Sequence, residues 1–257
     1  EPGGHQPPQL PEQRQIADQQ RQLAVDQRRV AEEQRGIAER SQDQAKAINQ
    51  FLLDMLGAAD IRKLGRDAKV AQALDAAATT VQQAFAHRPE VEPEVRLILG
   101  RTYLSLGMLD AATPQIEAAL QANRRLHGAT SQPYAMALRA QAALKRARGD
   151  DAAAARLFEQ AGDLLAATNG AEDRFVLATR TDHANCFVQL GRDAEAEGLL
   201  RELLGIRRRV FGDDDNDTQI GVNSLAVVLH RLGQLDEAET LYREAAAAGE
   251  RRFGALH

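Results

Sequence analysis

His183 and Cys186 stand one helical turn apart, a spacing at which an imidazole and a thiolate can bind one metal ion. A structural metal site needs further ligands at comparable spacing, and no second pair accompanies these two in the sequence. We therefore interpret Cys186 as a residue packed between helices, and we predict no metal and no cofactor. Cys186 is also the single cysteine, which excludes an internal disulfide.

A second candidate is the alternation of Asp213, Asp215 and Asp217, which is typical of the start of a calcium-binding loop. Thr218 occupies the position at which such a loop requires glycine, and Ser224 the position at which it requires glutamate. Aspartates that precede a helix instead accept hydrogen bonds from its free N–H groups and suit its dipole. We predict that these aspartates cap a helix.

No catalytic arrangement accompanies these residues. The sequence supports neither a Ser-His-Asp combination nor a phosphate-binding loop, so we predict that the segment is not an enzyme. Arginine clusters at 124–125, 207–209 and 251–252 come at the ends of predicted helices, where cations complement the helix dipole. The formal net charge is −5 with both signs mixed along the chain. This pattern lacks the basic face that nucleic-acid binding requires.

Composition indicates which elements hold these residues. Aromatic residues make up 4% of the 257 residues and tryptophan is absent, whereas alanine, leucine, glutamine, arginine and glutamate are abundant. These are strong helix formers, and no run of alternating β-branched residues predicts a strand. No apolar stretch reaches the roughly 18–20 residues that cross a bilayer. We expect an all-α fold.

Glycines recur at one fixed interval and predict how these helices are organised. The first series has a step of 42 residues: Gly65, Gly107, Gly149, Gly191 and Gly233. A second series keeps the same step, offset by 21 residues: Gly128, Gly170, Gly212 and Gly254. A period in this range indicates an array of similar supersecondary units. We expect one glycine to end the first helix of each unit and the other to end the second helix.

Four full copies share small and large residues at fixed distances from the first glycine. Seven residues before it is a small residue: Gly100, Ala142, Ala184, Ala226. Five residues after it is alanine: Ala112, Ala154, Ala196, Ala238. Nine residues after it is a large residue: Ile116, Phe158, Leu200, Tyr242. Twelve residues after it stand Ala119, Ala161, Leu203 and Ala245. Small residues let two helices approach closely and the large residue fills the remaining gap, so each unit is a helical hairpin.

The repeat resembles the tetratricopeptide repeat in the 42-residue form of kinesin light chains. The residues that carry the resemblance are Leu225-Ala226, Leu232-Gly233, Asp236-Glu237-Ala238-Glu239 and the loop from Arg208 to Asp213. The resemblance implies a right-handed superhelical solenoid that binds a protein or peptide in its concave groove. In the second unit Lys145 and Arg148 replace apolar residues of the other copies, so we expect its first helix to pack loosely.

Residues 47–56, Ala59-Asp60 and Leu99–Leu104 resemble the C-terminal region of bacterial serine/threonine protein kinases. In that family a kinase domain precedes a membrane span, a charged helix and these repeats. The resemblance implies that the chain belongs to a longer kinase, attached to a bacterial inner membrane through a span outside this sequence or located in the cytoplasm. The start at Glu1 without methionine agrees with that expectation.

The N-terminal part carries a seven-residue pattern. Large apolar residues recur with alanine directly after each of them: Ile16, Leu23, Val30 and Ile37, then Ala17, Ala24, Ala31 and Ala38. The complementary position holds Gln20, Gln27, Gln34 and Ser41, so a two-stranded coil would be weak. A helix from Glu12 to Leu56 would extend about 67 Å. The pattern predicts either a self-associating stalk or a solvated spacer helix.

These observations predict five regions. They are a disordered Pro/Gly-rich lead-in at 1–11, a heptad-patterned helical arm at 12–44, a degenerate capping repeat at 45–90, four 42-residue units at 91–254 and a tail at 255–257. In the capping repeat, Gly65, Leu74 and Ala77 take the glycine, large and small positions. A helix over about 45–57 is expected to pair with one over about 67–86.

The family's groove positions predict the binding residues. The candidate peptide-binding groove contains Arg101, Arg139, Arg146, Asn185, Gln189, Asn223 and His230. The remaining wall positions are Glu94, Leu97, Leu104, Met136, Ala143, Thr181, Val188, Val227 and Arg231. We expect Asn185 and Asn223 to hold a peptide backbone through their amides. The three arginines are expected to attract an acidic segment. The alternative is that these are ordinary solvated residues.

The sequence thus favours a non-catalytic protein- or peptide-binding scaffold, as the regulatory or sensor region of a bacterial serine/threonine kinase. Two alternatives stay open. The repeats belong to a signalling ATPase or transcriptional regulator, or the N-terminal helix makes the chain an oligomerisation stalk. The expected partners are a protein or peptide ligand and a second copy through the N-terminal helix, with no nucleic acid.

Overall fold

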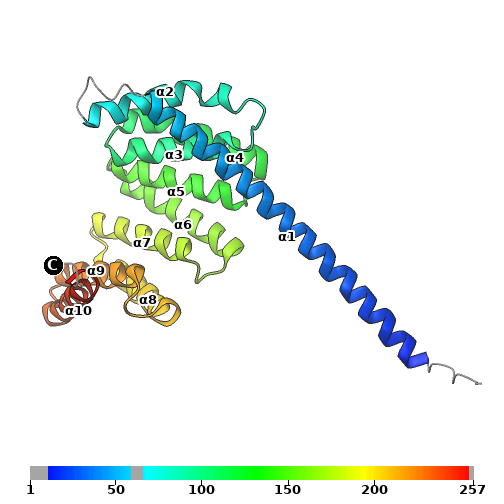
Figure 1. Cartoon of the computed structure of the whole chain (residues 1–257). Coiled ribbons are helices and arrows are strands. Elements are labelled where there is room, and N and C mark those ends of the chain that lie inside the picture. The colour runs from blue at the N-terminus through cyan, green and yellow to red at the C-terminus, as the bar shows by residue number, and fades with distance from the viewer. Residues whose placement is uncertain (1–10, 59–65, 255–257) are drawn as a thin grey trace, which may run out of the picture. The chain divides into compact units, whose positions relative to one another are not determined.

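The computed structural model describes residues 11–58 and 66–254, and every regular element in these ranges is a helix (Figure 1). Residues 1–10 of the predicted lead-in at 1–11, Gly65 and the tail at 255–257 lie outside the described residues, and Pro11 is the first residue of a helix. The chain divides into two compact units, residues 1–58 and residues 59–257. None of the described helices combines the length and the apolar character that crossing a bilayer requires.

The first unit is the single helix α1 (Pro11–Ala58), 48 residues long. It continues without a break across the predicted boundary between residues 44 and 45. Ion pairs one turn apart line its surface, as in Arg28–Glu32 at 2.8 Å and Arg35–Glu39 at 2.9 Å. These four side chains are exposed, and such pairs stabilise a helix only slightly.

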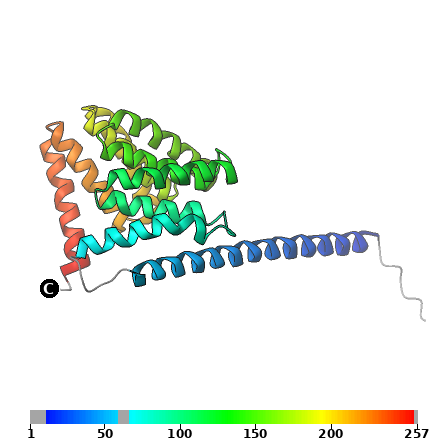
Figure 2. The same cartoon turned by 90° about the horizontal axis from the view of Figure 1, so that it is seen from above.

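The second unit is the repeat array, in which successive antiparallel helices stack beside one another (Figure 1, Figure 2). It begins with α2 (Arg66–Ala84), whose Leu74 and Ala77 are buried. Four helical hairpins follow: α3 (Glu92–Ser105) with α4 (Leu109–His127), α5 (Gln132–Ala147) with α6 (Asp151–Asn169), α7 (Arg174–Gln189) with α8 (Asp193–Phe211), and α9 (Asn216–Arg231) with α10 (Leu235–Phe253). The predicted all-α repeat fold is therefore confirmed.

Both glycine series end helices by the same backbone device. Gly191 follows α7 with a φ of 72°, and Gly212 follows α8 with a φ of 86°. Residues other than glycine rarely adopt such positive φ values, because their Cβ atom clashes with the backbone. This explains why glycine recurs at these positions. Gly254 differs, because it follows α10 with a φ of −66° in a helical conformation.

The first helices of three hairpins begin with capping side chains that repeat at the same step of 42 residues. Ser131, Asp173 and Asp215 each precede a first helix, and their side chains accept hydrogen bonds from backbone N–H groups. Asp215 accepts from the N–H of Asp217 at 2.9 Å. The prediction that Asp215 caps a helix is therefore confirmed.

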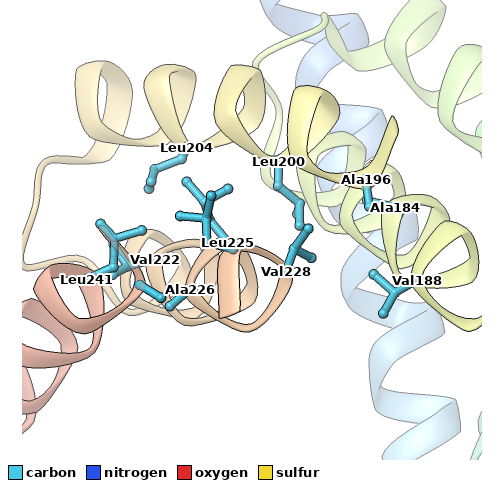
Figure 3. Close-up of a cluster of buried hydrophobic side chains, with 12 residues drawn as sticks. Ala184, Val188, Ala196, Leu200, Leu204, Val222, Leu225, Ala226, Val228 and Leu241 are labelled. Atoms are coloured by element: carbon cyan, nitrogen blue, oxygen red, sulfur yellow. The ribbon is translucent and has the colours of Figure 1, made fainter. Parts of the chain in front are cut away.

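Contacts between small and large residues hold each hairpin together, as the sequence pattern predicts. The four small residues before the glycine are all buried: Gly100, Ala142, Ala184 and Ala226. The large residues Ile116, Phe158 and Leu200 are at most 1% exposed. Figure 3 shows such a cluster, in which Ala184, Ala196 and Leu200 meet residues of the next unit. Tyr242 on α10 departs from the pattern at 37% exposure.

The second unit does not pack loosely, contrary to the expectation from Lys145 and Arg148. Helix α5 buries six residues: Ala135, Ala137, Leu138, Ala140, Ala142 and Leu144. Arg148 points back to the preceding hairpin, where its Nη2 donates to Asp110 Oδ1 at 3.0 Å and to Thr113 Oγ1 at 2.9 Å. The polar residue thus replaces an apolar contact with hydrogen bonds between units.

A buried arginine links the two helices of the third hairpin and packs beside the fourth. Arg207 on α8 is only 3% exposed. Its Nη2 donates to the carbonyl of Leu177 at 3.0 Å and to Thr181 Oγ1 at 2.8 Å, whereas Nε and Nη1 have no partner in the described part of the chain. Burial lowers the pKa of this guanidinium. Gly221 on α9 provides room for it, because a Cβ there would lie 3.0 Å from Arg207 Nη1.

Candidate functional site

A hollow on the array collects side chains from three hairpins. Arg101 and Leu104 come from α3, Met136 and Arg139 from α5, and Asp182 from α7. The residues completing the lining are Ser105, Ala140, Ala143 and Phe158. The first helices of three successive hairpins thus contribute both charged and apolar groups to one surface.

A second hollow continues the first along the array. It shares Leu104 and Ala143 with the first hollow and adds Arg146, Asn185 and Gln189. The remaining lining residues are Ala147, Gly149 and Asp151. The two hollows form a continuous surface across α3, α5 and α7, which we call the groove. Five of the seven candidate residues line it: Arg101, Arg139, Arg146, Asn185 and Gln189.

The electrostatic centre of the groove is Asp182, which two arginines of α5 share. Arg139 Nη2 donates to Asp182 Oδ2 at 3.1 Å, and Arg146 Nη1 donates to Asp182 Oδ1 at 3.1 Å. The guanidinium of Arg146 also lies over the Phe158 ring, 5.5 Å from its centroid. One carboxylate therefore faces two guanidinium groups, and the cluster keeps a net positive charge.

Arg101 adds a third cation at the other side of the first hollow. Its side chain is exposed, and the described residues supply no ion pair for it. Leu104 and Met136 beside it are half-buried and provide apolar surface. The groove therefore offers an unneutralised guanidinium next to aliphatic side chains, an arrangement that suits an acidic segment carrying apolar residues.

The two asparagines of the candidate site do not lie in the same hollow. Asn185 is half-buried in the second hollow, whereas Asn223 is exposed on α9 and lines neither hollow. Within the described residues, neither amide has a hydrogen-bond partner. His230 lines a different hollow at the end of the array, together with Leu235 and Tyr242.

Three further wall positions do not offer free side chains. Thr181 is 6% exposed and hydrogen-bonds Arg207 in the core, and Val188 is 8% exposed in a hydrophobic cluster. Arg231 donates from Nε to Asp193 Oδ1 at 2.9 Å. The expectation that Thr181 and Val188 lie on the groove wall is therefore wrong. Both face the packed interior between α7 and the next helices.

The sequence reasoning missed Asp182, although a signal was available. Asp182 is 43 residues after Arg139, one more than the repeat, and 36 residues after Arg146. Other ion pairs of the array span similar separations, as in Arg201–Glu237 and Arg208–Glu244, both with a separation of 36 residues. A search for opposite charges at these separations would have identified the pairs.

The two candidate metal ligands contact different neighbours. Cys186 is fully buried beside Ala142 and Phe158, and burial raises the pKa of its thiol to about 11. His183 instead stacks on Phe187 with ring centroids 4.5 Å apart, and burial lowers its pKa. In the described ranges, no three His, Cys, Asp or Glu residues are grouped so that they could hold a metal ion.

The aspartates that resemble a calcium loop face an arginine. Arg174 Nη2 donates to Asp215 Oδ2 at 2.8 Å, and its Nη1 donates to Asp217 Oδ2 at 2.7 Å. The same guanidinium lies 4.0 Å from the centroid of the Phe211 ring. The hydrogen bonds from Arg174 lower the pKa of Asp215. Asp215 and Asp217 therefore tie α7 to α9, and only Asp215 caps the helix. The prediction is not borne out for Asp217, which lies in the first turn of α9, or for Asp213, whose carboxylate pairs with Arg208 at 3.2 Å.

Sequence comparison agrees with this geometry. Residues 93–125 and residues 175–251 each match the tetratricopeptide repeat. The array is therefore a tetratricopeptide repeat array, a class of helical scaffold that generally binds protein or peptide partners and is typically non-catalytic. Comparison with curated proteins gives no match.

Several solved structures have a fold similar to that of this chain. A Podosopora anserina protein described as a kinesin light chain with nearly identical TPR-like repeats is 19% identical, with a TM-score of 0.61. The similarity covers 78% of this chain and 95% of that one. BtubC (BKLC) from P. vanneervenii is 19% identical with a TM-score of 0.63, over 73% of this chain and 75% of that one. At such identities the likeness is one of fold.

Proposed function

We propose that the repeat array is a non-catalytic scaffold that binds an acidic peptide segment of a partner protein in the groove across α3, α5 and α7. We further propose that it is the regulatory or sensor region of a bacterial serine/threonine protein kinase. The kinase proposal depends on the sequence resemblance of residues 47–56, 59–60 and 99–104, and the catalytic domain would lie outside this sequence.

The observation that carries the binding proposal is the charge of the groove. Arg101 has no ion pair among the described residues, and Arg139 and Arg146 share the single carboxylate of Asp182. A carboxylate of a bound peptide can contact Arg101 directly and compete with Asp182 for the other two guanidinium groups. The Asn185 amide, which can donate and accept, is available to the peptide backbone.

The direct test is fluorescence anisotropy with a library of labelled acidic peptides. Against the best binder, Arg101→Ala is expected to weaken affinity about tenfold, since a hydrogen bond to a charged group is worth about 1.5 kcal/mol. Asn185→Ala should weaken binding less. Arg125→Ala is the matched control, because Arg125 is an exposed arginine on α4 that lines neither hollow of the groove. Equal binding by the wild type, Arg101→Ala and Asn185→Ala would reject the groove as the binding site.

A second variant has the opposite expected effect. Asp182→Asn removes the carboxylate that occupies Arg139 and Arg146, so an acidic peptide should bind more tightly while the folded array becomes less stable. Binding that weakens in Asp182→Asn, at a temperature where circular dichroism shows it folded, contradicts the competition. Asn223→Ala should reduce affinity only for peptides long enough to reach α9.

The kinase proposal has an independent test. The coding sequence upstream of Glu1 should contain a protein-kinase domain with its glycine-rich loop and catalytic-loop aspartate. A Walker-type loop upstream would instead make the chain part of an ATPase. That result would reject the kinase context and leave the peptide-binding proposal unchanged.

A further inference from the structure

Helix α1 exposes a line of large aliphatic side chains. Leu23 is 59% exposed, Val30 46% and Ile37 54%, and they recur every seven residues. A period of seven keeps a stripe on one side of a helix only if the helix supercoils with a partner. Three such residues in line are therefore more than the scattered exposed hydrophobic residues of an ordinary surface.

The surface beside this line has the form of a coiled-coil hole. Asp26, Gln27, Val30, Ala31 and Gln34 line a shallow hollow on α1. Gln27, Val30, Ala31 and Gln34 are related as i, i+3, i+4 and i+7, which is the set of four residues that receives one side chain from a facing helix. The alanine leaves room, and the valine forms the apolar floor.

Charges differ between the two edges of this seam. One edge carries Asp26, Glu33 and, one heptad further on, Arg40, and the other carries Arg28 and Arg35 beyond the alanines. Asp26 also pairs with Arg29 of its own helix at 3.6 Å. Within the helix, Arg28 Nε donates a hydrogen bond to Glu32, and Arg35 Nε donates one to Glu39. When two such helices run parallel, the edge of one that holds Asp26 and Glu33 meets the arginine edge of the other. When they run antiparallel, the two arginine edges meet and repel.

We propose that α1 pairs with α1 of a second copy of this chain as a parallel, in-register two-stranded coil through Leu23, Val30 and Ile37. Gln20, Gln27 and Gln34 form the alternate layers of the seam and pair across it. Polar layers fix the register at a cost in stability, so the dimer dissociates on dilution. The proposal does not depend on what the groove binds.

The first test is the molar mass of the full chain by light scattering over a range of concentrations. The wild type should approach twice the monomer mass of 28.0 kDa at high concentration. Val30→Asp should stay monomeric. Val25→Asp is the matched control, because Val25 is 60% exposed on the same helix, about 140° around its axis from Val30. A monomeric wild type, or equal dimerisation of the two variants, overturns the proposal.

The second test fixes the orientation. In a parallel, in-register coil, residue 30 of one helix faces residue 30 of the other within disulfide reach, so Val30→Cys should form a covalent dimer on mild oxidation. Val25→Cys should not, and the wild type should not, because Cys186 is buried. A light-scattering dimer of Val30→Cys that fails to cross-link overturns the parallel register.

Discussion

Replacing Gly100 by alanine tests how closely the two helices of a repeat approach. Gly100 lies on α3 and faces α4, where an added Cβ would be 2.6 Å from Ile116 Cγ1 and 3.3 Å from the Ile116 backbone nitrogen. Carbon atoms in normal contact are about 3.5–4.0 Å apart. A side chain can rotate away from a new methyl group, but the backbone nitrogen moves only if the helices separate.

Two effects of opposite sign act in Gly100→Ala. Alanine favours the helix over glycine by about 1 kcal/mol. Overpacking a filled core costs about 1–3 kcal/mol, and here the backbone contact places the cost toward the upper end. We therefore expect Gly100→Ala to lower the free energy of unfolding by about 1–2 kcal/mol, measured by urea denaturation followed by circular dichroism.

Two other glycines distinguish steric overlap, helix propensity and backbone strain as causes of a change in stability. Gly205 lies within α8 with nothing within 4 Å of an added Cβ, so Gly205→Ala should stabilise the array by about 0.5–1 kcal/mol. Gly191 also has open space but a φ of +72°, so Gly191→Ala should destabilise it by about 1–2 kcal/mol through the backbone alone. Ile116→Ala should partly relieve Gly100→Ala but not Gly191→Ala. A stabilising Gly100→Ala, or strict additivity with Ile116→Ala, would refute the packing argument.

Three further predictions follow from buried or capping groups. Because burial raises the pKa of Cys186 to about 11, Ellman's reagent at pH 8 should modify the native chain at least about tenfold more slowly than the denatured chain, and equal rates would contradict this. Burial lowers the pKa of His183 below its ordinary value of 6.5, so this histidine binds a proton more readily in the unfolded chain than in the folded chain. The free energy of unfolding should therefore fall as the pH drops below 6.5. His183→Gln should therefore lose less stability between pH 8 and pH 5 than the wild type, as measured by urea midpoints. Asp173 accepts from the N–H groups of Phe175 and Val176, so Asp173→Ala should cost about 1 kcal/mol and Asp173→Ser clearly less.

The fold was predictable because its determinants repeat. Three kinds of residue recur at a step of 42 residues: a glycine at a positive φ, a small residue where two helices approach closely, and a large residue that fills the gap between them. Because the same pattern occurs in four copies, it can be recognised in the sequence. Lys145 and Arg148 led to a wrong expectation, since the sequence does not show that Arg148 reaches Asp110 in the preceding hairpin.

The candidate site was predictable only in part, because its determinants occur once. Arg139 and Arg146 were found at groove positions, but the aspartate between them has no counterpart in the other units, where Ile98, Ala140 and Ser224 stand. Thr181 was placed in the groove by position alone. Thr181 is buried, and its hydroxyl accepts a hydrogen bond from Arg207 Nη2 on α8, a contact that the position of Thr181 in the repeat does not reveal.

The buried Arg207 also limits which hairpin can follow α8 in the array. One unit earlier, the positions of Arg207 and Gly221 are held by Leu165 and Thr179, both fully buried. Because an added Cβ at Gly221 would lie 3.0 Å from Arg207 Nη1, a larger residue at that point of the following hairpin would force the guanidinium to shift. Hairpins of this chain are consequently not freely interchangeable, because a threonine at the position of Gly221 would set its side chain against the guanidinium of Arg207.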